Sequence, residues 1–452
     1  MIGKLCAVVA IATGVAACGG EEEDVDRHEV TYHRDLRPVV EESCLPCHES
    51  GGIGPFALES YDDLVGSFPL VLPAIESGAM PPWPAADGCH DIHGVRRLPD
   101  ETVEMFRTWQ AIEMPEGREK DYEPPPGDEL PPLGEPTLEI TMDVPYATHR
   151  LQPGEEDELR CFLLPEGIDE ESFMRALEVA PSTNTVHHLQ VHRVPAESVA
   201  AAQEVDAVSA AEGWPCFGDS AEGSYNLFSW HPGAEVIRFG QDEAAYLSEG
   251  SRLALQVHFN ADAYEVGEPI PEEQTTVRLW LLPQDELPDY VVVRFFLSGG
   301  AIFLPPGQQA VDVTQMNAMS DSVVEDGGFI PGEFIGHTPH MHWLGEGFNV
   351  TLHREDGEDE CLIDVPQWDF DWQLDYWYPK DKYVAFDETD MVTVTCNYDN
   401  GPANQPYVGG QQQAPRFVTF GQSSTDEMCL NHTWVRYERE AYLAARGEPG
   451  ER

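Results

Sequence analysis

Five histidines stand at spacings that could bring imidazoles together around a transition metal. His187 and His188 are adjacent in "TVHHLQVHRV", His258 lies in "LALQVHF", and "PHMHWLGEGF" contains His340 and His342. Alternate side chains of a strand share one face, so His340 and His342 should point the same way. His187 and His188 should face opposite sides unless the strand is twisted or bulged. Each histidine alone is as readily explained as a hydrogen-bonded surface side chain.

A methionine beside a cysteine adds a softer candidate ligand. Met428 and Cys429 are neighbours in "STDEMCLNHTWVRY", and Cys396 lies in "VTVTCNY". If both segments are strands, a Cys396–Cys429 disulfide would hold a core face and present Met428 outward. A thioether favours Cu(I), and zinc rarely recruits methionine. A blue-copper site would need a cysteine thiolate, and simple packing of Met428 is the other alternative.

Two further cysteines and a histidine in "SCLPCHES" follow the Cys-x-x-Cys-His pattern of c-type haem attachment. Cys44 and Cys47 would bond the haem vinyl groups, and His48 would ligate the iron. Met80, in the proline-stiffened stretch "SGAMPPWP", is the expected sixth ligand. The alternatives are a structural disulfide and a zinc site, which would need a second ligand pair at matching spacing. The stretch also resembles small cytochrome c domains attached to bacterial oxidases.

The first 18 residues have the pattern of a secretory signal. A lysine is followed by an apolar run, too short to span a bilayer comfortably, and then by small residues. "VAAC" resembles a bacterial lipobox, which would make Cys18 the lipidated first residue of the mature protein; an ordinary signal peptide is the alternative. We expect an exported protein, lipid-anchored to a bacterial outer membrane on its periplasmic or cell-surface side, with an acidic tether at 19–28.

Length and charge restrict the remaining possibilities. A chain of 452 residues predicts two to four domains, and a hydrophobic fraction of 41% is enough to fill real cores. The formal net charge of -57 argues against nucleic acid as a partner, because the phosphates would be repelled.

The elements that must position these residues change in type along the chain. Residues 29–115 have a helical pattern, in which Val103, Phe106 and Trp109 recur at helical spacing after Asp100 as a plausible cap. Residues 116–136 are rich in proline and acid and predict a semi-extended linker.

From residue 137 onward, short β-branched and aromatic segments are separated by Pro, Gly, Asn and Asp. This pattern predicts antiparallel strands rather than parallel βαβ units. The region exceeds one core, and "LPQDELPD" at 282–289 is the best internal break. The expected fold class is mainly β with a small α domain: a haem domain at 29–115, then two antiparallel sandwiches at 137–284 and 285–445.

Taken together and in order, "HH", "QVHF", "HMH" and "DEMC" resemble the copper type II, ascorbate-dependent monooxygenases, a family that includes peptidylglycine α-hydroxylating and dopamine β-monooxygenases. The resemblance covers about residues 137 to 440 and implies two jelly-roll-like sandwiches that bind two copper ions. One copper would be held by three histidines, which fall on His187, His188 and His258. The other, catalytic copper would be held by His340, His342 and Met428.

The resemblance implies an enzyme that inserts one atom of O2 into a C–H bond of a small organic substrate, the other atom leaving as water. The three-histidine copper would store and pass an electron, and an external donor, ascorbate or a cytochrome, would supply electrons. Thr338 stands where the peptide-processing enzymes have a substrate-binding arginine, so recognition of a peptide carboxylate is not expected.

Two other functions use the same residues. A non-catalytic copper-binding or electron-transfer lipoprotein could have the same ligands. A lytic polysaccharide oxidase would instead need a histidine at the mature N-terminus, where this chain has Cys18.

Export allows cysteines to pair. We expect disulfides Cys161–Cys216 and Cys396–Cys429, each within one proposed domain; Cys89 and Cys361 remain by parity, without an expectation that they join.

The haem and the copper sites on one chain suggest a relay. Ascorbate is an anion that a chain of charge -57 should repel, whereas a tethered cytochrome is held close by the linker. We therefore expect the haem held by His48 and Met80 to pass electrons to the copper at His187, His188 and His258. Service to an outside partner is the alternative.

Overall fold

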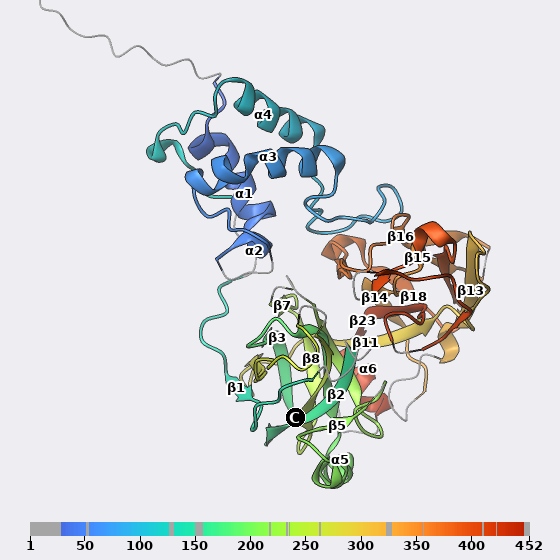
Figure 1. The fold of residues 1–452 in the computed structure, drawn as a ribbon. Helices are drawn as coiled ribbons and strands as arrows, with labels where there is room; N and C mark the ends of the chain where they lie inside the picture. Colours follow the sequence, from blue (N-terminus) through green and yellow to red (C-terminus); the bar gives the residue numbers. More distant parts are fainter. Residues whose placement is uncertain are drawn as a thin grey trace, which may run out of the picture.

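The computed structural model of the chain describes residues 29–446 except 51–53, 126–130, 150–156, 217, 232–233, 235, 262–263, 322–327, 356, 409–410 and 422. A helical region lies at one end, and the strands form the larger remainder (Figure 1). The mainly β class with several sheets, expected from the sequence, is confirmed. The predicted signal and Cys18 lie outside the described residues.

The helical region follows the apolar periodicity of its sequence. Its elements are η1 (Tyr32–Leu36), α1 (Arg37–Ser43), α2 (Leu45–His48), α3 (Tyr61–Ser77), α4 (Asp100–Ala111) and η2 (Glu119–Asp121). Val103, Phe106 and Trp109 are buried as predicted. Asp100 is the first residue of α4 rather than its cap, which is Pro99. Helix α3 begins with a capping box between Ser60 and Asp63, so its start is fixed by local hydrogen bonds.

The strands of the first half are β1 (Leu138–Thr141), β2 (Asp157–Gly167), β3 (Ser172–Ala180), β4 (Val186–Val194), β5 (Trp214–Pro215), β6 (Tyr225–Trp230), β7 (Ile237–Arg238), β8 (Glu243–Leu247), β9 (Arg252–Asn260) and β10 (Thr276–Leu281). Helix α5 (Ala196–Val208) interrupts them. Strands β5-β2-β9-β4-β6 form a five-stranded sheet. One hydrophobic core joins its inner face to strands β1, β10 and β3 of a larger sheet.

The strands of the second half are β11 (Tyr290–Ser298), β12 (Phe303–Leu304), β13 (Val311–Ala318), β14 (Gly332–His340), β15 (Gly345–His353), β16 (Asp359–Val365), β17 (Tyr376–Trp377), β18 (Val384–Phe386), β19 (Met391–Tyr398), β20 (Tyr407–Val408), β21 (Gln411–Gln412), β22 (Val418–Thr419) and β23 (Leu430–Glu438), with η3 (Met319–Asp321), η4 (Lys380–Lys382), η5 (Pro402–Asn404) and α6 (Arg439–Ala445). Strands β13-β19-β15-β16 form a four-stranded sheet. A second core packs this sheet against β11, β23 and β14.

The large sheet runs through both halves, in the order β1-β10-β3-β8-β11-β23-β14-β17. The halves join where β8 and β11 pair in parallel, with Val291 opposite Ala244. Arg436 and Glu243, both buried, form an ion pair of 2.8 Å across this junction. The expected break at 282–289 is a connection between β10 and β11, so the two sandwiches share one sheet. This continuity fixes the distance between residues on the two halves.

A disulfide between Cys89 and Cys361 joins the helical end of the chain to the second sandwich. Cys89 lies in the segment 81–97, which leaves α3 and reaches toward β16 and β15 (Figure 1). We call this segment the strap. Trp83 and Ala85 of the strap are buried in the core of the second sandwich. Sequence reasoning had not foreseen this bond, because it links residues 272 positions apart.

The two expected disulfides are also present, Cys161–Cys216 and Cys396–Cys429. Three disulfides in one chain are typical of an exported protein. No helix among the described residues is both long enough and apolar enough to span a membrane.

Candidate metal centres

The first centre is built by a bulge. Strand β4 pairs with β9, and their register shifts between Val186 and His188, so the extra residue His187 turns to the same side as His188. The ligand atoms of His187, His188 and His258 all lie within 4.8 Å of one another. Nδ1 of His187 and Nδ1 of His188 are 3.1 Å apart. Two nitrogens bound at about 2.0 Å to one tetrahedral ion lie roughly 3.3 Å apart, so this pair fits a shared metal.

The second centre forms where β14 ends. His340 is the last residue of the strand and His342 lies two residues beyond it, yet both line one cavity, with ring centroids 5.2 Å apart. Met428 precedes β23 and lines the same cavity. Met428 is only 6% exposed. The sequence argument that the disulfide presents Met428 outward is therefore corrected: its side chain points into a buried cavity.

The two ligand sets share this cavity, which has a volume of about 390 Å³. His188 and His258 line it from the first sandwich, and His340, His342 and Met428 line it from the second. The ring centroids of His188 and His340 are 6.1 Å apart. All three histidines of the first set and both of the second are thus gathered at one junction, although 153 positions separate His187 from His340 in the sequence.

Hydrogen bonds select the nitrogen that each histidine offers. His258 donates from Nε2 to Asp157 over 3.1 Å, which leaves Nδ1 for a metal. His340 donates from Nδ1 to the Gln373 side chain over 2.6 Å, and His342 donates from Nδ1 to the Asp426 carbonyl over 3.2 Å. Both residues of the second set therefore present Nε2, whereas the first set presents Nδ1.

Burial favours the neutral form of four of these imidazoles, which is the form that ligates metals. Desolvation lowers the pKa of His187 to about 4 and that of His188 well below its usual value. Desolvation also lowers the pKa of His340 to about 4, against the opposing hydrogen bond to Gln373, and lowers the pKa of His342 well below its usual value. Imidazole nitrogens with one thioether suit copper in both oxidation states.

Asp157 and Phe370 connect the two centres. Although burial opposes ionisation of Asp157, hydrogen bonds lower its pKa to about 2. One of its oxygens accepts from His258, and the other accepts from Ser424, on the second sandwich, over 2.9 Å. Phe370 stacks on His187 with ring centroids 5.3 Å apart and meets His342 edge-on at 6.1 Å. Neither residue carried a sequence signal, because its role depends on the packing of two distant segments.

Glu427 supports the second centre through hydrogen bonds to the backbone. This fully buried carboxyl accepts backbone N–H groups from His342 at 2.9 Å, Leu344 at 2.6 Å and Met428 at 3.3 Å. Burial raises its pKa to about 8, and the three N–H groups oppose that shift. It therefore ties the loop after β14 to the residue before the Cys396–Cys429 disulfide. Sequence reasoning missed Glu427, although it stands in the "DEMC" motif.

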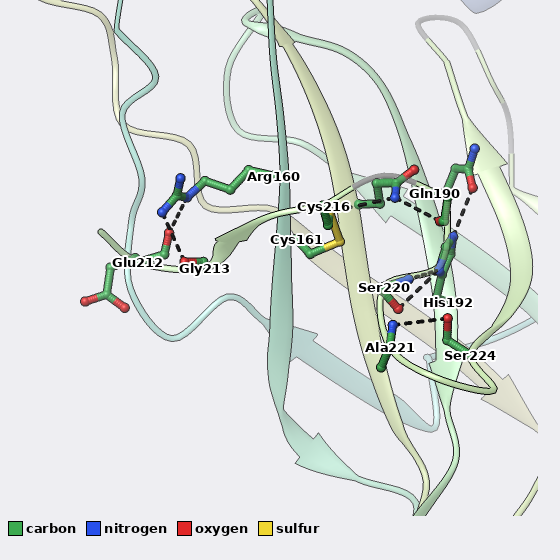
Figure 2. The surroundings of a disulfide bond; sticks show 12 residues. Arg160, Cys161, Gln190, His192, Glu212, Gly213, Cys216, Ser220, Ala221 and Ser224 are labelled. Atoms are coloured by element: carbon green, nitrogen blue, oxygen red, sulfur yellow. Dashed lines mark hydrogen bonds between the residues drawn. A yellow bond between two sulfur atoms is a disulfide. The ribbon is translucent and has the colours of Figure 1, made fainter. Parts of the chain in front are cut away.

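The histidines outside the two sets have other partners. His192 is 2% exposed and lines the cavity. Both of its nitrogens are occupied, Nε2 by Gln190 at 2.9 Å and Nδ1 by Ser220 (Figure 2). Figure 2 also shows the neighbouring Cys161–Cys216 disulfide, which fixes the segment before Ser220 against β2. His432 lines the cavity, whereas His337 packs in the second core and bonds to Asn431.

The proposed haem-binding residues lie in the helical region. Among the described residues, the disulfides Cys89–Cys361, Cys161–Cys216 and Cys396–Cys429 do not include Cys44 or Cys47. His48 donates from Nδ1 to the Phe56 carbonyl over 2.8 Å, so Nε2 is the nitrogen offered to a metal. A Cβ on Gly54 would lie 2.7 Å from the His48 ring, so glycine is needed for this close approach. The donors therefore fit a c-type haem.

Comparison with known proteins supports the second half most directly. Residues 292–441 match the family model "Copper type II ascorbate-dependent monooxygenase, C-terminal domain". No curated protein matches the chain. Among solved structures, the major capsid protein P2 of bacteriophage PM2 aligns at 7% identity over 66% of this chain and 96% of that chain, with a TM-score of 0.27. The infectious bursal disease virus VP2 subviral particle aligns at 9% identity over 70% and 74%, with a TM-score of 0.19. Neither structural likeness is strong enough to carry an argument.

The matched range contains His340, His342 and Met428, and the three histidines of the first centre precede it. The proposed ligands of the second centre therefore lie inside the part of the chain that matches the C-terminal domain of the copper type II ascorbate-dependent monooxygenases.

Proposed function

We propose that the protein is an exported copper monooxygenase that hydroxylates a C–H bond of a small organic substrate with O2. The observation that carries this proposal is that His188 and His258, with His187 beside them, meet His340, His342 and Met428 at one cavity, which His187 itself does not line. The family of residues 292–441 supports the same chemistry. Copper held by these two sets would supply one-electron redox changes and the activation of O2.

The chain's own residues hold and orient the reacting groups. Asp157 and Gln373 fix the imidazole rings of His258 and His340, which is the usual task of hydrogen-bonded partners behind metal ligands. Buried aromatic and aliphatic side chains line much of the remaining cavity, including Phe370 and Val293, and limit the access of water. A substrate bound there would lie beside the second ligand set.

The helical region would serve as the electron donor domain. Cys44, Cys47, His48 and Met80 would hold a c-type haem, which would supply single electrons. We retain the proposals that Cys18 anchors the protein by a lipid and that an external donor reduces it. The strap ends in contacts with the second sandwich, where the backbone N–H of His93 donates to the Trp377 carbonyl over 2.7 Å. These contacts attach the helical region to the second sandwich independently of the linker.

The test is oxygen consumption by the copper-loaded full chain with panels of small aromatic, amine and lipid compounds, with analysis of products. A monooxygenase should consume O2 in proportion to hydroxylated product. The rival function, a non-catalytic copper-binding or electron-transfer lipoprotein, predicts redox cycling without product, and that result would replace our proposal.

Glu427→Ala should lower copper content from two ions per chain toward one. The substitution leaves the buried N–H groups of His342, Leu344 and Met428 without their acceptor, at a cost of roughly 1–3 kcal/mol for each unsatisfied group. Metal analysis after dialysis measures the result, and Glu427→Gln, which keeps an acceptor oxygen, should retain more copper.

Glu273→Ala is the matched control. Glu273 is also fully buried and accepts the backbone N–H groups of Ser182 and Thr183, but it does not line the cavity. It should destabilise the fold and leave the copper content at two ions. Equal copper loss in both variants would refute the specific role of Glu427.

His258→Ala should slow the anaerobic reoxidation of the reduced haem domain by bound Cu(II) at least tenfold. His258 completes the first set, and its loss removes one of the three ligands that would hold the expected electron acceptor. Stopped-flow absorbance of the haem measures the rate, with His353→Ala as a control because His353 bonds to Asp359 away from the cavity. Equal rates in wild type and His258→Ala would contradict the relay.

A further inference from the structure

Arg294, on β11, is a buried arginine whose hydrogen bonding is incomplete. It is 2% exposed and lines the cavity. One terminal nitrogen, Nη1, donates to Asn226 Oδ1 and to Ser229 Oγ, both at 2.6 Å. The other two guanidinium nitrogens, Nε and Nη2, have no hydrogen-bond partner among the described residues. A charged donor buried without a partner is costly, so a site that retains one has a use for it.

The positive charge of Arg294 is also poorly balanced. Burial lowers its pKa to about 10, so the guanidinium remains a cation at neutral pH. Asp375 is the acid that stabilises this charge most, but no hydrogen bond or ion pair joins the two in the described part of the chain. Asp375 instead accepts from the hydroxyl of Thr338. A cationic pocket inside a chain of net charge -57 is a local exception that favours an anion.

The rest of the lining decides what kind of anion fits. Phe295, Phe296 and Phe420 line the cavity, and Phe296 is 63% exposed, which joins an apolar surface to the outside. Asp219 is the acid among the lining residues, and burial raises its pKa. A cavity of about 390 Å³ is in the size range of small-molecule sites. A small anion alone would leave the aromatic surface unused.

We propose that the cavity binds an organic carboxylate. Its carboxylate group accepts hydrogen bonds from Nε and Nη2 of Arg294, and its apolar body lies against the aromatic lining. The proposal rests on the proposed function, because it names the substrate class of that same cavity. A guanidinium with two adjacent N–H groups matches the two oxygens of a carboxylate.

Arg294, the proposed anion-binding residue, lies on β11, whereas Thr338, the position considered in the sequence, lies on β14. Thr338, on β14, donates to Asp375 and accepts from Trp434 over 3.3 Å, so it is occupied within the fold. Arg294 lies over the Trp434 ring at 5.1 Å and its charge lowers the pKa of His340. A head group on Arg294 therefore lies close to the second ligand set, with the substrate body beside it.

The test measures binding to the metal-free full chain, so that coordination to copper cannot contribute. Isothermal titration compares 4-phenylbutyrate with the neutral 4-phenylbutanamide. We expect the carboxylate to bind wild type at least tenfold more tightly than the amide, and Arg294→Gln to remove that preference. Arg294→Lys should keep part of it, since the charge remains but the paired donors do not.

Arg193→Gln is the matched control, because Arg193 is equally buried but does not line the cavity. It should keep the full preference for the carboxylate. Equal binding of carboxylate and amide to wild type would overturn the proposal without any variant, which covers the case in which Arg294→Gln fails to fold. Carboxylate binding without hydroxylated product would leave this site standing and count only against the monooxygenase function.

Discussion

Replacing Met428 by leucine should lower the rate of coupled oxygen consumption and product formation by at least roughly 100-fold. Leucine has nearly the volume and apolar character of methionine, so the 6% exposed position should stay filled at a cost below about 1.5 kcal/mol. What is lost is the thioether, the soft ligand that favours Cu(I) beside His340 and His342. The change therefore separates metal chemistry from packing.

Metal analysis and spectroscopy of the Cu(II) form check the interpretation. The copper at His187, His188 and His258 should stay bound in the Met428→Leu variant, since none of its ligands has changed. Met174→Leu is the matched control, because Met174 is fully buried in the core of the first sandwich and lies outside the cavity. Turnover should be unchanged in that control. Unchanged turnover in Met428→Leu would remove Met428 from the reaction.

The two ligand sets were expected from the resemblance of the ordered motifs to a copper family, whereas strand periodicity alone left each histidine with another explanation. Adjacent His187 and His188 required a bulge, and the register shift of β4 against β9 supplies it. The direction of Met428 was misjudged because it precedes β23, so strand alternation does not apply to it. Strand alternation therefore fails where a loop sets the direction of a side chain.

The residues that sequence reasoning missed act through distant packing. Glu427 contacts His342 across 85 positions, and Ser424 reaches Asp157 across 267. Arg294 sits in a strand that reads as apolar, "YVVVRFFL", where a single arginine has no visible partner. No short motif encodes such contacts, since they exist only after the two sandwiches share one sheet. For the same reason, the 282–289 connection could not be distinguished from a true separation.

The two ligand sets lie close to each other across the cavity. His188 and His340 face each other with ring centroids 6.1 Å apart, and Phe370 contacts both sets. In the proposed enzyme, an electron that reached either set would therefore be close to the other. The Asp157–Ser424 hydrogen bond ties the two sandwiches together near this point, so the spacing is set by the shared sheet and by direct contacts.

Removing the bond between Cys89 and Cys361 should have the largest effect on stability among the three disulfides. The bond closes a stretch of 272 residues, against 55 for Cys161–Cys216 and 33 for Cys396–Cys429. In the chain-entropy account, a loop of that length contributes about 5 kcal/mol. The double variant Cys89→Ser/Cys361→Ser should melt roughly 5–10 °C lower than wild type.

The same variant tests whether the strap holds the helical region in place. Its non-covalent contacts with the second sandwich include the packing of Trp83 against Tyr376 at 5.3 Å and hydrogen bonds from the backbone N–H groups of Ala86 and His93 to the carbonyls of Asp364 and Trp377, over 2.8 and 2.7 Å. Without the disulfide, trypsin should cut faster after Arg96 and Arg97, at the end of the strap. Cys161→Ser/Cys216→Ser, the matched control, should melt lower without faster cleavage there. Equal cleavage in wild type and the Cys89→Ser/Cys361→Ser variant would mean that packing alone holds the strap, and that the disulfide does not position the electron donor domain.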